Sequence, residues 1–126
     1  MCAAPALSVA AATFTPMTED EYLRGLALIR AGRHFEAHEE LEIAWRAAKP
    51  AERDFLQGLV HVAVAWYQAD RGNRIGCARQ LEKAARRLGP YAPEHRGVDV
   101  TATLDRLSEA QMVVESGSLS LPPPTV

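Results

Sequence analysis

The stretch that decides the fold is Phe55-Leu56-Gln57-Gly58-Leu59-Val60-His61-Val62-Ala63-Val64-Ala65-Trp66-Tyr67. Its apolar side chains would cover most of the circumference of a helix, which we expect over residues 51–70, directly after Pro50. A helix that is apolar nearly all round is buried between neighbours. We therefore predict a central third helix with other helices around it, and Gly58 would let one of them cross closely.

Turn and capping signals predict two helices before this central one. Thr18-Glu19-Asp20-Glu21 has the pattern of a capping box, so a first helix should follow and end near Arg30. Its buried face is expected to hold Tyr22, Leu23, Leu26 and Ile29. Gly32 should end this helix in a left-handed conformation. The second helix is expected from His34 to Ala48.

Two further helices are predicted after the central one. Gly72-Asn73 is a turn signal that precedes a helix over residues 74–88, which Gly89-Pro90 stops. Its predicted buried face is Ile75, Cys77 or Ala78, Leu81, Ala84 or Ala85, and Leu88. Residues 91–97 read as a loop. Asp99 can cap a fifth helix, which Gly117 ends.

Small residues repeat in a way that resembles two tetratricopeptide hairpins. Gly32, Ala37 and Ala44 in one half are echoed by Ala78 and Ala85 in the other. Two such hairpins are fewer than the three repeats that a solenoid usually needs. The fold class predicted is therefore all-α: a compact bundle of about five helices with two tetratricopeptide-like antiparallel hairpins, not a peptide-binding superhelix.

Length and composition predict one domain with two irregular ends. A chain of 126 residues, 48% of them hydrophobic, is long enough for one sizeable core. Residues 1–16 are rich in Ala and Pro but lack a basic start, so we interpret them as a flexible extension and not as a signal peptide. Residues 17–116 are the predicted helical domain. Residues 117–126, with three consecutive prolines, are a predicted disordered tail.

The charge balance argues against nucleic acids and membranes as partners. The formal net charge is −2, which gives no general attraction to phosphates or acidic lipids. A basic stripe from Arg79 to Arg87 lacks interleaved aromatic residues and is interpreted as a solvated helix face. No apolar run approaches the roughly 20 residues of a membrane span. Cys2 and Cys77 have no metal spacing, so we expect reduced thiols and a cytoplasmic protein.

Paired motifs in this chain resemble a known family of small helical proteins. The first is Phe35-x-x-His38-Glu39-x-x-Glu42-x-x-Trp45; the others are Phe55-Leu56-Gln57-Gly58-Leu59 and Gly72-Asn73-x-x-Gly76-Cys77-Ala78. They are similar to the bacterial and archaeal family known as domain of unknown function 309, over about residues 18–110. The resemblance implies an all-helical bundle that brings the His-Glu-x-x-Glu and Gln-Gly elements together. It implies no activity, substrate or cofactor.

A candidate polar site lies on the second and third helices. His38 falls between Leu41 and Trp45, on the face predicted to be apolar, whereas His34 reads as a partly wet surface residue near the helix start. A buried ionisable ring needs a hydrogen-bond partner. The predicted polar pocket is lined by His38, Glu39, Glu42, Trp45, Gln57, His61 and Tyr67. Glu39 could face the core, the solvent or another subunit.

Three interpretations of this site stay open. His38, Glu42 and His61 could hold a divalent metal such as zinc, manganese or iron, since His and Glu at i, i+4 share one helix face. The same groups could instead satisfy each other as a structural network. They could also line a pocket for a small molecule or a partner.

We therefore predict a non-catalytic ligand-binding or protein-interaction module. It would form a homodimer through apolar surface left by the third or fifth helix. The alternative is a metal-dependent enzyme or a metal-binding protein that uses the His/Glu cluster between the second and third helices. The sequence does not decide whether the protein is an enzyme.

Overall fold

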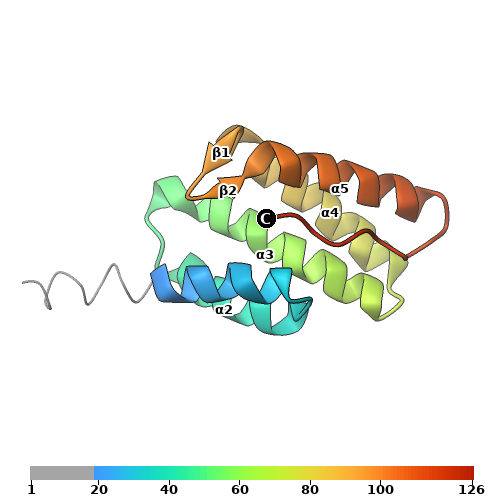
Figure 1. Ribbon diagram of the computed structural model, residues 1–126, viewed down its shortest axis with the longest axis horizontal. Coiled ribbons are helices and arrows are strands. Elements are labelled where there is room, and N and C mark those ends of the chain that lie inside the picture. Colours follow the sequence, from blue (N-terminus) through green and yellow to red (C-terminus); the bar gives the residue numbers. More distant parts are fainter. Residues whose placement is uncertain (1–18) are drawn as a thin grey trace, which may run out of the picture.

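The structure, a computed structural model, describes residues 19–126. The predicted extension over residues 1–16, and Thr18 of the capping box, lie outside the described residues. Within 19–126 the chain forms an N-terminal helix over residues 19–30, then α2 (His34–Arg46), α3 (Pro50–Asp70), α4 (Arg74–Leu88) and α5 (Val100–Glu115). A short 3-10 helix, η1 (Gly89–Tyr91), and two strands, β1 (Glu94–His95) and β2 (Val98–Asp99), lie between α4 and α5. The predicted all-α bundle is confirmed (Figure 1).

Helix α3 lies at the centre of the bundle, as its all-round apolar pattern predicts. Figure 1 shows α3 in green between the other helices, and its closest packing partners are α4 and α2. Ten of its residues are buried: Phe55, Leu56, Gly58, Leu59, Val60, Val62, Ala63, Ala65, Trp66 and Ala69. Burial of this kind supplies the main driving force for folding. In the described part of the chain, no helix is long and apolar enough to cross a membrane.

The predicted close crossing at Gly58 occurs between α3 and α4. A Cβ atom placed on Gly58 would lie 2.7 Å from both Cγ and Cδ2 of Leu88, which is fully buried. This separation is shorter than real carbon–carbon contacts, so only glycine lets the two helices come this close. Gly58 therefore sets the distance between the central helix and α4.

Turns and caps explain why the helices begin and end where they do. Gly32 and Gly72 both have positive φ angles, 80° and 75°, which glycine adopts without a steric penalty. The side chain of Asn73 accepts a hydrogen bond from the Gly76 amide, and Asp99 accepts one from the Ala102 amide. The predicted cap at Asp99 is thus confirmed.

Two predicted core residues are on the surface. Leu23 is 50% exposed and Ile75 is 68% exposed. The buried face of the N-terminal helix follows Tyr22, Leu26 and Ile29, so Leu23 falls about 100° away from it. Ile75 similarly precedes the buried stripe of α4, which begins at Cys77. Helix α2 also ends earlier than predicted, at Arg46 instead of Ala48.

The predicted loop over residues 91–97 contains regular structure. After η1, strands β1 and β2 pair antiparallel, with His95 opposite Val98. The two residues between them, Arg96 and Gly97, both have positive φ angles, 48° and 82°. Two consecutive positive φ angles are typical of a tight hairpin turn. An arginine in the first of these positions carries no sequence signal for such a turn, so the hairpin was not expected.

The C-terminal segment, residues 118–126, is predicted from sequence to be a disordered tail, but in the structure it lies along the bundle. It contains no helix or strand. It returns from the end of α5 and passes over α3 (Figure 1, red). Leu119, Leu121 and Val126 pack against the hydrophobic core. Composition alone suggested disorder, because it contains no information about the surface that the segment meets.

We expect Gly58→Ala to destabilise the protein by about 1–3 kcal/mol, the usual cost of overpacking a core. The added methyl group would meet Leu88, which is enclosed by the core and has little room to move. Urea unfolding monitored by circular dichroism measures the loss.

Gly89→Ala is the matched control. Gly89 follows α4 directly and has helical backbone angles, and no atom lies within 4 Å of the position of its added Cβ. This substitution should be neutral or slightly stabilising. Equal effects of the two substitutions would contradict the close crossing.

Candidate functional site

An open cleft lies between α2, α3 and α4 and brings most of the predicted site together. Its volume is about 240 Å³. The lining residues are His38, Glu42, Trp45, Gln57, Val60, His61, Val64 and Gln80. Five of the seven residues in the predicted pocket are among them, and Tyr67 lines a neighbouring hollow. Glu39 is exposed and lines neither.

The two histidines of α2 exchange the roles that the sequence suggests. The buried face of α2 is His34, Ala37, Leu41 and Ala44, at steps of three, four and three residues. His34 is only 8% exposed, whereas His38 is half-buried at the edge of the cleft. The sequence prediction placed Trp45 at the core, but Trp45 is half-buried and lines the cleft. The buried face of α2 is therefore rotated towards His34 relative to the prediction.

One ring nitrogen of His38 has a hydrogen-bond partner within α2. Its Nδ1 lies 3.3 Å from the carbonyl oxygen of Phe35, which can only accept, so this nitrogen donates. Its Nε2 lies 3.7 Å from Oε2 of Glu42, one turn later on the same helix. Glu42 also accepts a 3.4 Å hydrogen bond from Arg46. His38 and Glu42 thus each have one hydrogen-bond partner within α2, Phe35 and Arg46 respectively.

His61, in contrast, has one partnered and one unpartnered nitrogen. Its Nδ1 lies 2.7 Å from Oε1 of Gln80 on α4. An amide oxygen only accepts, so Nδ1 carries the proton and Nε2 presents a lone pair. That Nε2 is buried without a hydrogen-bond partner. Burial lowers the pKa of His61 below its ordinary value, against an opposing contribution from the Gln80 hydrogen bond. Burial therefore favours the neutral ring, whose acceptor Nε2 has no partner.

Trp45, which lines the same cleft, has an unpartnered donor. Its indole Nε1 is buried without a hydrogen-bond partner. The guanidinium of Arg53 lies 4.8 Å from the centroid of the Trp45 ring, in a cation–π contact that holds the ring in place. Four buried side-chain atoms within residues 19–126 lack partners, and two of them belong to residues that line this cleft.

A second hollow of about 190 Å³ continues from the cleft along α3. It is lined by Phe35, His38, Val64, Tyr67 and Gln68, so it shares two residues with the cleft. The rings of Phe35 and Tyr67 lie 5.3 Å apart between centroids. This hollow is mainly apolar, and it extends the polar cleft towards the start of α2.

Gln80 is the site residue that sequence reasoning missed. It fixes the tautomer of His61 and lies beside Leu81, at the edge of the buried stripe of α4. Helix α4 is otherwise highly charged, and Gln80 is its one amide side chain. The sequence did contain one signal for Gln80: it is an uncharged polar residue that borders the apolar stripe of a charged helix.

The described residues do not assemble a metal site of the predicted kind. His38, Glu42 and His61 all line the cleft. Within residues 19–126, however, no three His, Cys, Asp or Glu side chains are grouped closely enough to hold an ion.

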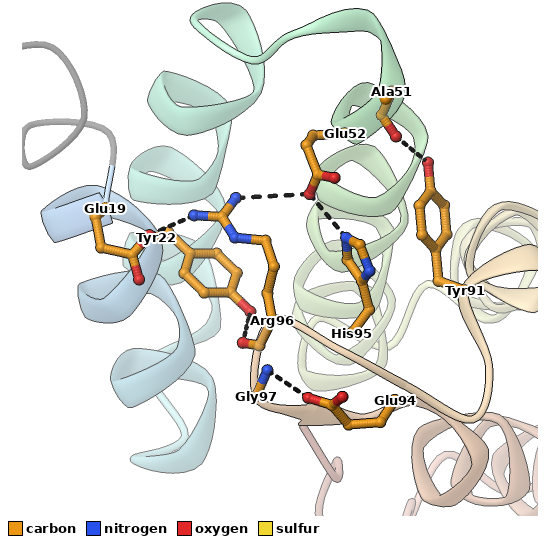
Figure 2. Close-up of polar contacts among 9 residues, drawn as sticks. All are labelled: Glu19, Tyr22, Ala51, Glu52, Tyr91, Glu94, His95, Arg96 and Gly97. Atoms are coloured by element: carbon orange, nitrogen blue, oxygen red, sulfur yellow. Dashed lines mark hydrogen bonds and ion pairs between the residues drawn. The ribbon is translucent and has the colours of Figure 1, made fainter.

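A second polar cluster joins the hairpin to the N-terminal helix and the start of α3 (Figure 2). The guanidinium of Arg96 lies 2.5 Å from Glu19 and 3.9 Å from Glu52. It also stacks 4.1 Å from the centroid of the Tyr22 ring. His95 contacts Glu52 at 2.8 Å. The cluster therefore ties together three elements that are distant in sequence.

The hydrogen bonds of this cluster are matched within it. The Tyr22 hydroxyl donates to the carbonyl oxygen of Arg96 at 2.7 Å, and burial raises the pKa of Tyr22 to about 12. The Tyr91 hydroxyl donates to the carbonyl oxygen of Ala51 at 2.8 Å. The left-handed backbone of Arg96 costs about 1–2 kcal/mol, which these contacts offset. We interpret this cluster as a structural clamp for the hairpin.

Comparison with known families gives one match. Residues 22–80 match the family model described as Domain of unknown function (DUF309). The matched stretch is shorter than the range over which the motifs resemble that family, but it contains every residue that lines the cleft. No curated protein and no solved structure gives a significant match to the chain.

We expect the free energy of unfolding to fall as the pH is lowered through about 6.5, the ordinary pKa of histidine. Burial lowers the pKa of both His34 and His61, so in this range the unfolded chain binds protons that the folded chain does not. The stabilisation is complete above the unfolded pKa and is lost as the pH falls towards the folded values. Urea unfolding at about pH 7.5 and about pH 5.5 measures it.

The His34→Gln/His61→Gln double variant is the control for this pH dependence. It should lose less stability between the two pH values than the unsubstituted protein. An identical loss in both proteins would show that other groups are responsible.

Proposed function

We propose that this chain, whose residues 22–80 belong to the DUF309 family, is a non-catalytic module that binds a small polar molecule in the cleft between α2, α3 and α4. The proposal is supported by two unpartnered buried atoms on residues that line this cleft, the acceptor Nε2 of His61 and the donor Nε1 of Trp45. The family description names no activity, so the proposal rests on the cleft itself.

The energetics of unpaired atoms favour a ligand. A buried polar group without a partner costs about 1–3 kcal/mol. A molecule that donates to His61 and accepts from Trp45 would recover this free energy for both residues. It would enter a cleft whose walls already fix the two rings, through Gln80 and Arg53 respectively.

Size and charge narrow the class of ligand. The cleft, at about 240 Å³, is below the usual range for drug-sized ligands and cofactors. The cleft is lined by the acidic Glu42, and the basic Arg53 lies over the ring of Trp45, another lining residue, so charges of both signs are near the cleft. A small neutral molecule with one donor and one acceptor, such as a primary amide, fits both constraints.

The residues that line the cleft favour binding over covalent chemistry. They include no serine, threonine or cysteine. Cys77, the free cysteine of the described residues, is fully buried, and burial raises its pKa to about 11. Its thiol is therefore a poor nucleophile at neutral pH.

Binding can be tested by NMR with a panel of small primary amides, because the chain has only two tryptophans. We expect the indole N–H signal of Trp45 to shift on titration, since its donor is unpaired. The signal of Trp66 is an internal control, because its Nε1 already donates to the carbonyl oxygen of Pro122. Trp45→Phe should weaken binding of a responding amide several-fold to about tenfold, measured by calorimetry. Equal shifts of both signals, or none, would contradict the proposal.

A metal site at His38, Glu42 and His61 is the alternative function, and one observation favours it. The hydrogen bond to Gln80 holds His61 in the way that metal-bound histidines are held by a partner on their other ring nitrogen, and it leaves Nε2 without a partner. Against it, His38 Nδ1 already contacts the Phe35 carbonyl oxygen, and Glu42 already accepts a hydrogen bond from Arg46.

Metal analysis separates the two functions. Protein purified without a histidine tag should contain well under one equivalent of zinc, manganese or iron, as measured by plasma mass spectrometry. One equivalent, lost in His38→Ala but retained in Glu39→Ala, would establish the metal site instead. Glu39 is exposed and outside the cleft, which makes it a matched control.

We also propose a cytoplasmic homodimer with helical hairpins of tetratricopeptide-like character. Of the two helices considered for self-association, α3 has its apolar surface buried in the core, so α5 is the remaining candidate. Met112 on α5 is 66% exposed. Nucleic acid is not proposed as a partner, since Arg86 and Arg87 in the basic stripe pair with Glu82 and Asp54.

A further inference from the structure

The C-terminal segment, residues 118–126, occupies a groove formed by three helices. Donors from each helix bind main-chain oxygens of the segment. Trp66 of α3 donates to Pro122 at 3.0 Å, and Arg106 of α5 donates to Pro123 at 2.5 Å. Arg30, at the end of the N-terminal helix, donates twice to the oxygen of Val126, at 2.7 and 3.2 Å.

This pattern is the one by which proteins recognise extended proline-rich peptides. Proline has no amide hydrogen and fixes φ, so a run of prolines is already extended and leaves its carbonyl oxygens free to accept. Recognition sites for such peptides supply an aromatic surface and side-chain donors. Trp66 provides both, because it lines the groove beside Leu121 and Pro123 and its indole nitrogen donates to Pro122.

The segment does not fill the groove. A hollow of about 290 Å³ remains beside it. The segment side is Leu121, Pro123 and Pro124, and the bundle side is Ile29, Arg30, Gly32, His34, Trp66 and Asp70. His34 is 8% exposed there and its Nδ1 has no hydrogen-bond partner. The groove thus has space and an unsatisfied polar atom that its present occupant does not use.

We propose that this groove is a binding site for an extended, proline-containing segment of a partner protein, and that residues 118–126 are an internal competitor for it. The partner segment would accept hydrogen bonds from Trp66, Arg106 and Arg30, and would place a larger or polar side chain in the hollow next to His34. None of the groove's lining residues lines the ligand cleft, so this proposal does not depend on that one.

Tethering predicts how the competition behaves. A segment joined by a short linker has an effective concentration of roughly millimolar, so it masks the groove from a free peptide of similar affinity. Loosening the segment should therefore expose the groove. Leu121 packs against the core and has little else to hold it, so Leu121→Ser weakens the segment without altering the donors.

The probe is a fluorescein-labelled peptide with the sequence of residues 118–126, Ser-Leu-Ser-Leu-Pro-Pro-Pro-Thr-Val. Fluorescence polarisation is measured with full-length protein. We expect Leu121→Ser to bind the peptide at least about tenfold more tightly than the unsubstituted chain, and not to bind a scrambled peptide. Equal affinity of the two proteins for the peptide would overturn the proposal.

Arg106→Gln in the Leu121→Ser background tests the donors. It should weaken peptide binding by roughly tenfold, the usual effect of losing a charged hydrogen bond. Arg79→Gln, an exposed arginine on α4, should change nothing. Trp66→Phe keeps the ring and removes the donor, so it should act like Arg106→Gln. Insensitivity to both Arg106→Gln and Trp66→Phe would show that the peptide binds elsewhere and would overturn the proposal.

The same proteins, measured without peptide, show whether the segment that binds the groove comes from a partner protein or from a second copy of this chain. Light scattering should show that Leu121→Ser has the same mass as the unsubstituted protein. A larger species in Leu121→Ser that is lost when Arg106→Gln is added would identify a second copy of this chain as the occupant of the groove. This result would overturn the assignment to a partner protein.

Discussion

The close contact between α3 and α4 at Gly58 is the constraint on which the rest of the structure depends. It brings the central helix near enough to α4 for Leu88 to fill the space that a side chain would occupy. With α2 on another side, α3 is buried along most of its surface. His61, a polar residue in the middle of α3, therefore lies at a seam between α3 and its neighbours. The cleft forms at such a seam, where His61 of α3 reaches Gln80 of α4.

The fold was predictable because the strongest signals were local. The apolar run of α3, the glycine turns and the cap at Asp99 each follow from short-range rules, and the structure contains all of them. The hairpin was not predictable, since Arg96 adopts a backbone conformation that depends on contacts with Glu19 and Glu52, far away in sequence. The course of residues 118–126 depends likewise on donors from three different helices.

The candidate site was predictable in membership but not in detail. The sequence predicts one pocket between two adjacent helices, and five of its seven predicted residues line the cleft. The predicted phase of α2 is wrong, because its buried face passes through His34 and Ala44 and not through His38 and Trp45. As a result His34, predicted to be partly exposed, is buried, and His38, predicted to be buried, is only half-buried. Gln80 was missed because its importance lies in one contact to another helix.

The family match ends at Gln80, so all the residues that line the cleft lie within the matched stretch, whereas Arg106 and residues 118–126 lie beyond it.

The position of Arg96 has a consequence for how the molecule opens. Its strained backbone is tolerated only while its guanidinium and carbonyl group contact Glu19 and Tyr22, which lie more than seventy residues earlier in the chain. If the N-terminal helix detaches, the hairpin loses the contacts that compensate for this strain. If the hairpin detaches, the helix loses the partner of its buried tyrosine. The N-terminal helix and the hairpin therefore stabilise each other, so we expect that the loss of one would lower the stability of the other.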